Sequence, residues 1–534
     1  MSLPHVAYFS MEMAIDQSLH TYSGGLGFLA GSHMLSAGAL KLPLIGVTIL
    51  WTQGYGDQVI NEQNQVDIVY RARNYPFLKE TGITVDVSVF GEVVKVKALK
   101  LEPETFNTVP VYFLTTDIAE NKPEHRYLTQ KLYDGDQKVR ISQEIILGIG
   151  GLRAIQAAQE PVDVVHLNEG HALPAAFELL SQLNGNIDEV RRRMVFTTHT
   201  PVAAGNETHP VQLLAESGFF ANTSVEEAIR LGGHEFSLTV AALRMSRMAN
   251  GVSQLHGQVA NNMWSWVEGR CPIVAITNST NLHYWQDARI KQVHTNEELL
   301  AVKREMKREM FESIERETGK TFDDQVLTVV WARRFTEYKR ADLIFSDMER
   351  IKRLLDGKKL QLVFAGKFHP LDTWGRNTWN RVLELSQQLN NVVILPGYEL
   401  SMSGLLKRGA DLWLNTPLRP LEASGTSGMS ANMNGAIHMS TFDGWAVEGT
   451  YHGLNGFTIN ERVTLEHLPI EERHRRDYES MMDLLENTVV PMYYQNPTQW
   501  ANLMRHAIQI AESYFHSDRM VIEYYNRLYK PISL

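Results

Sequence analysis

The segment Val162-Asp-Val-Val-His-Leu-Asn-Glu-Gly-His171 carries the pattern from which we predict the fold. Its apolar part, 162–167, is typical of a buried strand, and polar side chains follow where that strand ends. A helical stretch at 142–158 comes directly before it. Strands and helices that alternate in this way form parallel sheets covered on both faces, so we predict an α/β fold.

The same alternation recurs on both sides of this segment. Further strands are predicted at 6–9, 44–50, 109–113, 194–198, 326–331, 360–365, 392–395 and 412–414. Helices are predicted between them at 30–40, 225–231, 341–355 and 378–389. A polar, charged stretch near 286–320 separates two such series, so we predict two doubly wound, Rossmann-like domains at 1–285 and 286–505. Ligands of open α/β sheets bind beyond the carboxyl ends of the strands, so we expect the two domains to face a central cleft that holds the site.

The composition is that of a globular protein that binds neither nucleic acid nor membranes. Of 534 residues, 44% are hydrophobic and 21% are charged, close to the average for soluble folded chains. The 61 acidic residues outnumber the 51 basic ones by 10. Proteins that bind nucleic acid or anionic membranes usually have an excess of basic residues instead. Cys271 is the single cysteine, which excludes an internal disulfide and favours a reducing compartment. Because the start lacks the features of a signal peptide and no apolar run reaches about 18 residues, we predict a cytoplasmic enzyme.

Three glycines follow the first predicted strand, in Tyr22-Ser-Gly-Gly-Leu-Gly27. Gly24, Gly25 and Gly27 precede the predicted helix at 30–40, and the N-terminus of a helix offers N–H groups to an anion. A tight turn explains the same glycines equally well, so both interpretations stay open.

Polar residues that suit hydrogen bonding to a polyhydroxyl ligand follow two other strands. Asn168, Glu169 and His171 come after the strand at 162–167, and His199 comes after the strand at 194–198. Zinc is an alternative ligand for such residues, but the spacing of known zinc motifs is absent, and we predict no metal. An ordinary buried histidine with a satisfied hydrogen bond explains each histidine taken alone.

Basic residues follow the strand at 326–331, in Trp331-Ala-Arg-Arg-Phe-Thr-Glu-Tyr-Lys-Arg340. A charge run of this kind is commonly a solvated surface. Because the strand is predicted to be buried, its carboxyl end should lie at the site, where an arginine and a lysine form a clamp for phosphate oxygens.

Small residues and hydroxyls lead into a helix predicted to start near Ser427, in Pro420-Leu-Glu-Ala-Ser-Gly-Thr-Ser-Gly-Met-Ser-Ala-Asn-Met-Asn-Gly435. The start of this helix is a second candidate site for an anion, with Glu422 just before it. Two such helix ends, a basic clamp and several polar groups indicate sugar-phosphate transfer. Hydride transfer is disfavoured because no GxGxxG motif with a downstream acidic residue is present.

Ordered motifs along almost the whole chain resemble the α-glucan (glycogen) phosphorylase family, especially its shorter bacterial branch. They include Tyr8-Phe-Ser-Met-Glu12, the segment 165–171, the basic segment 332–340, the segment 419–429 and Asp443-Gly-Trp-Ala-Val-Glu-Gly449. The resemblance implies a GT-B fold and retaining transfer of an α-1,4-glucosyl unit between a glucan end and phosphate. It also implies that 1–285 is the acceptor or glucan side, that 286–505 is the donor phosphate side, and that a C-terminal helix at 506–534 crosses back onto the first domain.

The resemblance assigns roles to individual residues. Arg334 and Lys339 would bind the substrate phosphate, the loop of His199 would contact the glucosyl unit, and Glu422 would face the sugar hydroxyls, which makes these four the predicted catalytic group. The predicted substrate-binding residues are Gly24, Gly25, Gly27, Asn168, Glu169, His171, Ser424 and Gly425. The residues predicted to receive the donor or cofactor phosphate are Thr426, Ser427 and Gly428.

Ser430 departs from the family at the position of the cofactor. Active family members have a lysine here that holds pyridoxal phosphate as an imine, and serine has no amine with which to form one. We therefore predict that no cofactor is covalently bound. A second departure, Thr277-Asn-Ser-Thr-Asn-Leu-His283, predicts a pocket of altered local shape.

The absent lysine favours a retaining α-glucosyltransferase that uses a phosphate-activated donor, by preference a sugar nucleotide, and a sugar or α-glucan acceptor. Arg334, Lys339 and the helix start at Ser427 would then neutralise the donor phosphates without a metal. The alternatives are an α-1,4-glucan phosphorylase that forms glucose 1-phosphate from glucan and phosphate, and an inactive glucan-binding homologue. The family also makes a homodimer an expectation.

Overall fold

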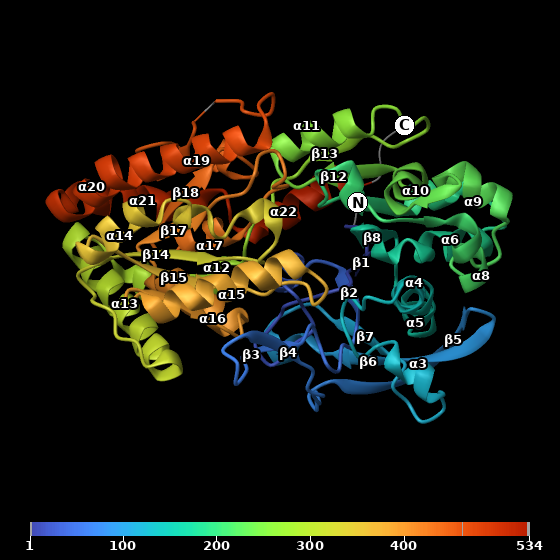
Figure 1. The fold of residues 1–534 in the computed structure, drawn as a ribbon. Coiled ribbons are helices and arrows are strands. Elements are labelled where there is room, and N and C mark those ends of the chain that lie inside the picture. Colours follow the sequence, from blue (N-terminus) through green and yellow to red (C-terminus); the bar gives the residue numbers. More distant parts are fainter. Residues whose placement is uncertain (1–2, 462, 531–534) are drawn as a thin grey trace. The chain divides into compact units, whose positions relative to one another are not determined.

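The computed structural model describes residues 3–461 and 463–530 and divides into two compact units (Figure 1). Unit 1 comprises Met1–Gly56, Tyr70–Thr277 and Ser517–Leu534, and unit 2 comprises Asp57–Val69 and Asn278–His516. The predicted boundaries are residue 285, at the end of the first domain, and residue 506, at the start of the C-terminal helix. Unit 2 in addition takes the early hairpin of β3 (Asp57–Ile60) and β4 (Val66–Val69), whose Val66 N–H donates to Asn380 Oδ1 at 2.8 Å.

Unit 1 contains a nine-stranded sheet in the order β13-β12-β9-β8-β1-β2-β7-β6-β5. Seven of these strands are parallel: β1 (Val6–Phe9), β2 (Leu44–Ile49), β7 (Val111–Thr115), β8 (Val164–Asn168), β9 (Met194–Thr197), β12 (Met248–Gly251) and β13 (Ile273–Ala275). The hairpin of β5 (Lys79–Val89) and β6 (Glu92–Leu101) adds an antiparallel edge. A separate two-stranded sheet joins β10 (Thr208–Pro210) to β11 (Glu235–Ser237).

Unit 2 contains a six-stranded, fully parallel sheet in the order β16-β15-β14-β17-β18-β19. Its strands are β14 (Leu327–Ala332), β15 (Leu360–Ala365), β16 (Val392–Leu395), β17 (Leu412–Asn415), β18 (Ile437–Thr441) and β19 (Gly456–Ile459). In both sheets the strand order reverses direction beside the first strand, which is the doubly wound arrangement. The predicted α/β fold with parallel sheets is confirmed.

Helices connect the parallel strands in both units. Those of unit 1 are α1 (Gly25–Ala39), α2 (Pro103–Phe106), α3 (Pro123–Tyr127), α4 (Gln137–Ile145), α5 (Gly151–Ala157), α6 (Pro174–Gln182), α7 (Ile187–Arg193), α8 (Val211–Ser217), α9 (Val225–Gly232), α10 (Leu238–Met245), α11 (Gln254–Met263) and α22 (Ser517–Tyr524). Those of unit 2 are α12 (Leu282–Trp285), α13 (Asn296–Thr318), α14 (Met348–Asp356), α15 (Thr373–Gln388), α16 (Leu400–Gly409), α17 (Ser427–Asn432), α18 (Ala446–Gly449), α19 (Ile470–Leu484), α20 (Val490–Gln495) and α21 (Pro497–Ser513). Local sequence explains several starts; α13, for example, has a capping box of Thr295 and Glu298.

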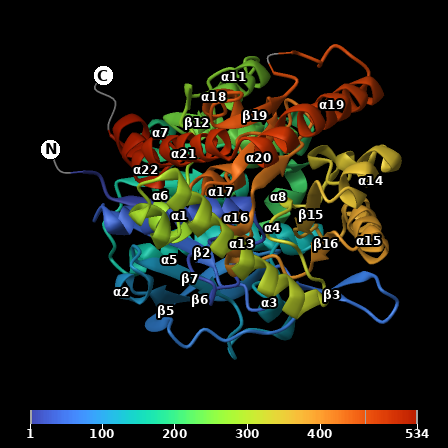
Figure 2. The same cartoon turned by 90° about the vertical axis from the view of Figure 1, so that its left-hand side faces the viewer.

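Alternate residues of β1 show that both faces of the unit 1 sheet are covered. Ala7 and Phe9 belong to one buried apolar cluster, and Val6 and Tyr8 belong to another. The second cluster also contains Tyr524 and Tyr529 from the end of the chain. The C-terminal segment is therefore part of the unit 1 core, with α22 packed on α1 (Figure 2).

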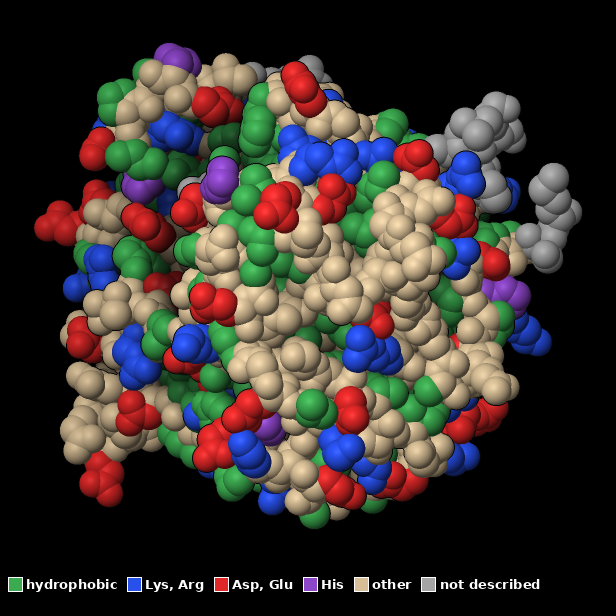
Figure 3. Space-filling view, turned by 90° about the vertical axis from the view of Figure 1, so that its right-hand side faces the viewer, with side chains coloured by type: hydrophobic (Ala, Val, Ile, Leu, Met, Phe, Trp, Pro, Cys, Tyr) green, Lys and Arg blue, Asp and Glu red, His purple; other side chains and the backbone are tan. Residues whose placement is uncertain are grey.

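The distribution of charge on the surface agrees with the mixture of acidic and basic residues in the sequence. The face drawn in Figure 3 carries acidic and basic side chains interspersed with one another. Among the residues that the structure describes, no helix is both long and apolar enough to cross a membrane.

Candidate active site

The strand order of unit 2 reverses between β14 and β17, and the carboxyl ends of these strands place a charged and a polar residue at one edge of the sheet. Arg333 follows β14 directly and Thr416 follows β17. The connections leave this point in opposite directions, so the backbone leaves room for a ligand at this edge of a doubly wound sheet.

Glu422 binds two cations at this edge. Arg333 Nη2 donates to Glu422 Oε2 at 2.6 Å, and Lys339 Nζ donates to the same oxygen at 2.9 Å. All three side chains are at least nine-tenths buried. Burial by itself raises the pKa of Glu422, but the charges of Arg333 and Lys339 outweigh burial and hold this pKa at about 2. The structure thus joins two predicted catalytic residues, Lys339 and Glu422, as an ionised group.

Arg333, rather than the predicted Arg334, shares Glu422 with Lys339. Arg334 is exposed, whereas Arg333 is 7% exposed. Arg333 Nη1 is buried and has no hydrogen-bond partner among the described residues. A buried guanidinium N–H without a partner is a donor suited to a ligand oxygen. The phosphate-binding role of Arg334 stays a prediction.

Gly425 and Asp443 shape the backbone between Glu422 and α17. Gly425 has a φ of 77°, and a Cβ there would lie 3.2 Å from Arg333 Nη2, so glycine allows the arginine to approach. Asp443 accepts the N–H of Glu422 at 2.9 Å and the N–H of Gly444 at 2.8 Å. Burial raises the pKa of Asp443 to about 8. No role is predicted for Asp443 from the sequence, although its position directly after the short apolar run of β18 could have indicated one.

The predicted start of α17 at Ser427 is confirmed. Thr426 is the N-cap residue, and Trp413 Nε1 donates to Ser427 Oγ at 3.2 Å. A Cβ on Gly428 would lie 2.7 Å from the His438 ring and 2.8 Å from Trp445, so packing requires glycine there. Phosphate binding by this helix start stays a prediction, as does sugar binding by Ser424, whose carbonyl accepts the Trp445 N–H.

The surroundings of Ser430 do not fit a covalently held pyridoxal phosphate. Ser430 is fully buried, and its hydroxyl donates back to the carbonyls of Thr426 and Ser427 at 3.1 and 3.2 Å. No lysine occurs in α17. Lys407 on α16 is a buried amine in the same unit, with Nζ 3.3 Å from the centroid of the Trp285 ring.

A hydrogen-bonded group lies at the corresponding point of unit 1, where β1 is beside β8. Asn168 Nδ2 donates to Ser10 Oγ at 3.1 Å, and Asn168 Oδ1 lies 2.7 Å from His199 Nε2, which is therefore the protonated nitrogen. Glu169 Oε2 accepts the backbone N–H of His199 at 2.7 Å. Burial lowers the pKa of His199 to about 3 and raises that of Glu169 to about 7.

His171 lies in the 3₁₀ turn Gly170–Ala172, directly after Glu169. Burial and the charge of Arg140 lower the pKa of His171 to about 4. Its ring lies 5.8 Å from the ring of Tyr133, centroid to centroid. Three of the predicted substrate-binding residues, Asn168, Glu169 and His171, therefore lie together at the carboxyl end of β8, because they are neighbours in the sequence. Their substrate-binding roles stay predictions.

Glu12 is a carboxylate that sequence reasoning missed, and it lies inside the glycine loop. It accepts the N–H groups of Ser23 and Gly24 at 2.6 and 3.2 Å, and the Tyr133 hydroxyl at 2.9 Å. A Cβ on Gly27 would lie 2.8 Å from Glu12 Oε2 and 2.5 Å from Tyr22 Cβ, so this glycine is required by packing. A Cβ on Gly24 or Gly25 would meet no described atom within 4 Å. The position of Glu12 in the sequence could have indicated this carboxylate, because it lies just after β1, the strand beside the point where the strand order reverses.

Helix α1 begins at Gly25, five residues before its predicted start at 30, so Gly25 and Gly27 are part of its first turn. No side chain of the described residues caps its N-terminus. Two Rossmann-like units, each with polar residues at the reversal point of a parallel sheet, give the protein the two-sheet architecture of the GT-B fold.

Comparison with known proteins identifies the family. Residues 244–452 match the family of carbohydrate phosphorylases. An uncharacterized protein of Methanocaldococcus jannaschii is 44% identical over 98% of this chain and 99% of its own length. The maltodextrin phosphorylase of Thermococcus litoralis is 33% identical over 98% of this chain and 70% of its own, and the glycogen phosphorylase of Aquifex aeolicus is 31% identical over 99% and 86%. The chain belongs to the carbohydrate phosphorylase family.

Proposed function

We propose that this protein is a glycosyltransferase-class enzyme that moves a glucosyl unit between the end of an α-glucan and phosphate, with glucose 1-phosphate as the product or donor. The buried group of Arg333, Lys339 and Glu422 carries the proposal, because Arg333 Nη1 offers an N–H that no described residue accepts, at the carboxyl end of β14. Relatives named maltodextrin and glycogen phosphorylase support the same reaction class.

The absent lysine at position 430 favours a sugar-nucleotide donor when the sequence is taken alone. The named relatives instead favour the first of the two alternatives, an α-1,4-glucan phosphorylase, and the proposal follows them. Phosphate requires only a compact cationic site, which Arg333 and Lys339 supply without a nucleotide pocket.

In the direction of glucan synthesis, the cationic group binds the phosphate of glucose 1-phosphate and stabilises the negative charge that develops on it as the C1–O bond breaks. The acceptor hydroxyl attacks from the face that the phosphate leaves, and a phosphate oxygen takes the hydroxyl proton. Glu422 keeps Arg333 and Lys339 oriented. The group Asn168, Glu169 and His199 of unit 1 offers donors and acceptors for sugar hydroxyls.

We also propose that the protein works without a cofactor held as an imine, since Ser430 lacks an amine. Incubation with pyridoxal phosphate, borohydride reduction and peptide mass spectrometry should yield no stoichiometric adduct. An adduct on one lysine, with Lys407 the first to inspect because its amine is buried, would contradict the cofactor proposal. It would leave the phosphorylase proposal standing, so the two fail separately.

The reaction itself is tested with the purified full-length chain, maltodextrin and inorganic phosphate. Glucose 1-phosphate should form only when phosphate is present, and the reverse mixture should lengthen the glucan. Transfer from a sugar nucleotide with no phosphorolysis would return the function to the sugar-nucleotide alternative. Sugar binding without turnover from any donor would identify an inactive homologue.

A further inference from the structure

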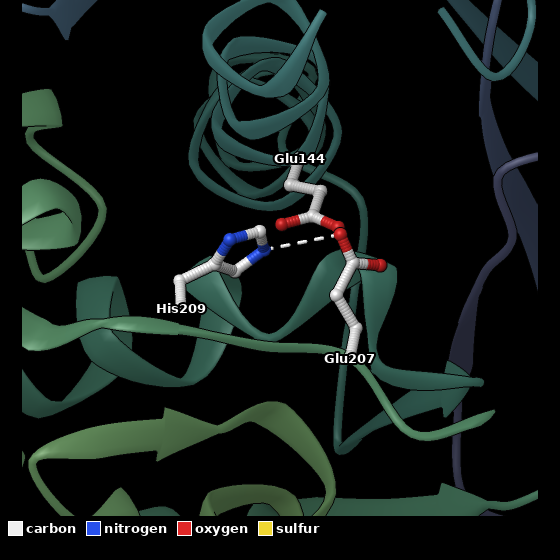
Figure 4. A group of neighbouring side chains, drawn as sticks. All are labelled: Glu144, Glu207 and His209. Carbon is white, nitrogen blue, oxygen red and sulfur yellow. Dashed lines mark hydrogen bonds and ion pairs between the residues drawn. The ribbon is translucent and has the colours of Figure 1, made fainter. Parts of the chain in front are cut away.

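A cluster of two buried residues, Glu144 and His209, and the half-buried Glu207 lies in unit 1, outside the residues assigned above to phosphate and sugar (Figure 4). Glu144 is on α4, Glu207 is in the loop after the 3₁₀ turn Ala203–Gly205, and His209 is on β10. One oxygen of each carboxylate and one nitrogen of the imidazole lie within 4.8 Å of one another. We propose that these three residues bind a divalent transition-metal ion, with zinc as the first candidate.

Glu144 is the observation that points to a ligand. Its side chain is fully buried and its carboxylate is directed at Glu207 and His209 (Figure 4). Neither of its oxygens has a hydrogen-bond partner among the described residues. A buried carboxylate without donors is costly unless it is protonated or meets a cation. Burial, followed by the charge of Glu207, raises the pKa of Glu144 well above its ordinary value.

Glu207 and His209 are already oriented for this role. Arg140 holds both oxygens of Glu207, with Nε to Oε1 and Nη2 to Oε2 at 2.6 Å each. His209 Nε2 lies 3.0 Å from Glu207 Oε1, and His209 Nδ1 lies 3.0 Å from Gln137 Nε2. The outer contacts of Arg140 and Gln137 fix the two ligands in the way that outer residues support metal ligands elsewhere.

The charges and distances suit a dication. Two ionised glutamates and Arg140 leave one net negative charge with the imidazole neutral. Ligand atoms that surround zinc at about 2.0–2.2 Å stand about 3.4 Å apart, so the three atoms need only side-chain adjustment. Two carboxylates and one imidazole are a mixed oxygen and nitrogen set of the kind that zinc, manganese and cobalt accept.

Each of the three side chains must offer a lone pair to the ion. Glu144 does so as a carboxylate, through the oxygens to which no described residue donates a hydrogen bond. His209 binds through Nε2, with the ring hydrogen on Nδ1, where the Gln137 amide turns its oxygen to accept it.

Isothermal titration of the metal-free, full-length protein with zinc chloride tests the proposal. One ion should bind per chain. E144Q should bind zinc at least about 10-fold more weakly, while E178Q should bind like the unchanged protein. Glu178 is a matched control, because it is a buried glutamate of unit 1 paired with Arg153.

His209→Asn provides a second variant that keeps both carboxylates. It should also weaken binding, with circular dichroism used to verify folding. Absence of a stoichiometric site would overturn the proposal. Binding that persists unchanged in E144Q would overturn it as well, since zinc would then be held by other histidines.

Discussion

Glu422 places one carboxylate oxygen between two buried cations, which makes its charge indispensable to both. Arg333 and Lys339 each donate one hydrogen bond to this oxygen, and each has further N–H groups that a ligand can accept. Removal of the charge would leave two cations buried without their counter-ion, which is more costly than the loss of an ordinary hydrogen bond.

Glu422→Gln should therefore reduce phosphate-dependent turnover by about 10²–10³-fold, the effect typical of the loss of a preorganised charge. It should also lower the free energy of unfolding, by about 3–5 kcal/mol, as a broken buried ion pair does. Glucose 1-phosphate formation, corrected for the folded fraction, separates the two effects.

Asp411→Asn is the matched control for Glu422→Gln. Asp411 forms a buried ion pair with Lys307 at 2.6 Å, but it precedes β17 and so lies at the opposite edge of the same sheet. It should lose stability and keep its turnover per folded molecule. Equal loss of turnover in both variants would mean that Glu422 has only a structural role.

Glu169 makes the stability of unit 1 depend on pH. Its pKa is raised to about 7 in the folded protein, from an ordinary value of 4.5. The unfolded chain therefore loses this proton first as pH rises, and the free energy of unfolding falls between about pH 4.5 and 7 and levels off above 7. The unfolding free energy of the unchanged protein minus that of E169Q, measured in urea, should fall from pH 5 to pH 8, because glutamine does not titrate. A difference that is constant with pH would contradict the raised pKa.

Sequence reasoning located the edge of each sheet where the polar residues gather but could not resolve individual side chains. Arg333 and Arg334 are neighbours of identical chemistry, and only the fold shows that Arg333 is the buried one. The raised pKa of Asp443 depends on burial, which no motif records. Glu12 could have been found, because it follows the strand beside the point of reversal.

At the scale of elements, the start of α1 offers a matched pair of glycines. Gly27→Ala should destabilise the protein by about 1–3 kcal/mol, because its Cβ would lie 2.8 Å from Glu12 Oε2 and 2.5 Å from Tyr22 Cβ. Gly25→Ala should change stability by less than about 1 kcal/mol, since the added Cβ meets no described atom.

If the glycine loop lies against a ligand, Gly25→Ala should nevertheless raise the KM for glucose 1-phosphate. Urea unfolding and initial-rate kinetics on the two variants measure these effects. An unchanged KM in Gly25→Ala would contradict ligand binding by the loop and would support its interpretation as a tight turn.

Buried parallel strands were the elements that sequence predicted best. The predicted strands at 6–9, 360–365 and 392–395 coincide with β1, β15 and β16. The hairpin of β5 and β6 was missed because its charged residues alternate with apolar ones and interrupt any apolar run. The helix predicted at 142–158 is divided by a π-helical turn at Ile146–Gly150, which hydrophobic periodicity does not report.

At the scale of the whole molecule, the chain closes on itself within unit 1. Tyr529 Oη lies 2.6 Å from His166 Nδ1, and Asn250 Nδ2 donates to Tyr524 Oη at 3.0 Å, so the chain end is tied to strands β8 and β12. The two units carry separate polar groups, one of hydrogen-bonded uncharged and acidic residues in unit 1 and one that contains Arg333 and Lys339 in unit 2. The proposed reaction uses one group for the sugar and the other for the phosphate.

The most direct test is the release of glucose 1-phosphate from maltodextrin by the purified chain, with and without inorganic phosphate and without added pyridoxal phosphate. Glucose 1-phosphate should accumulate only in the mixture that contains phosphate. Absence of glucose 1-phosphate in both mixtures, with the protein folded, would contradict the proposed phosphorylase reaction.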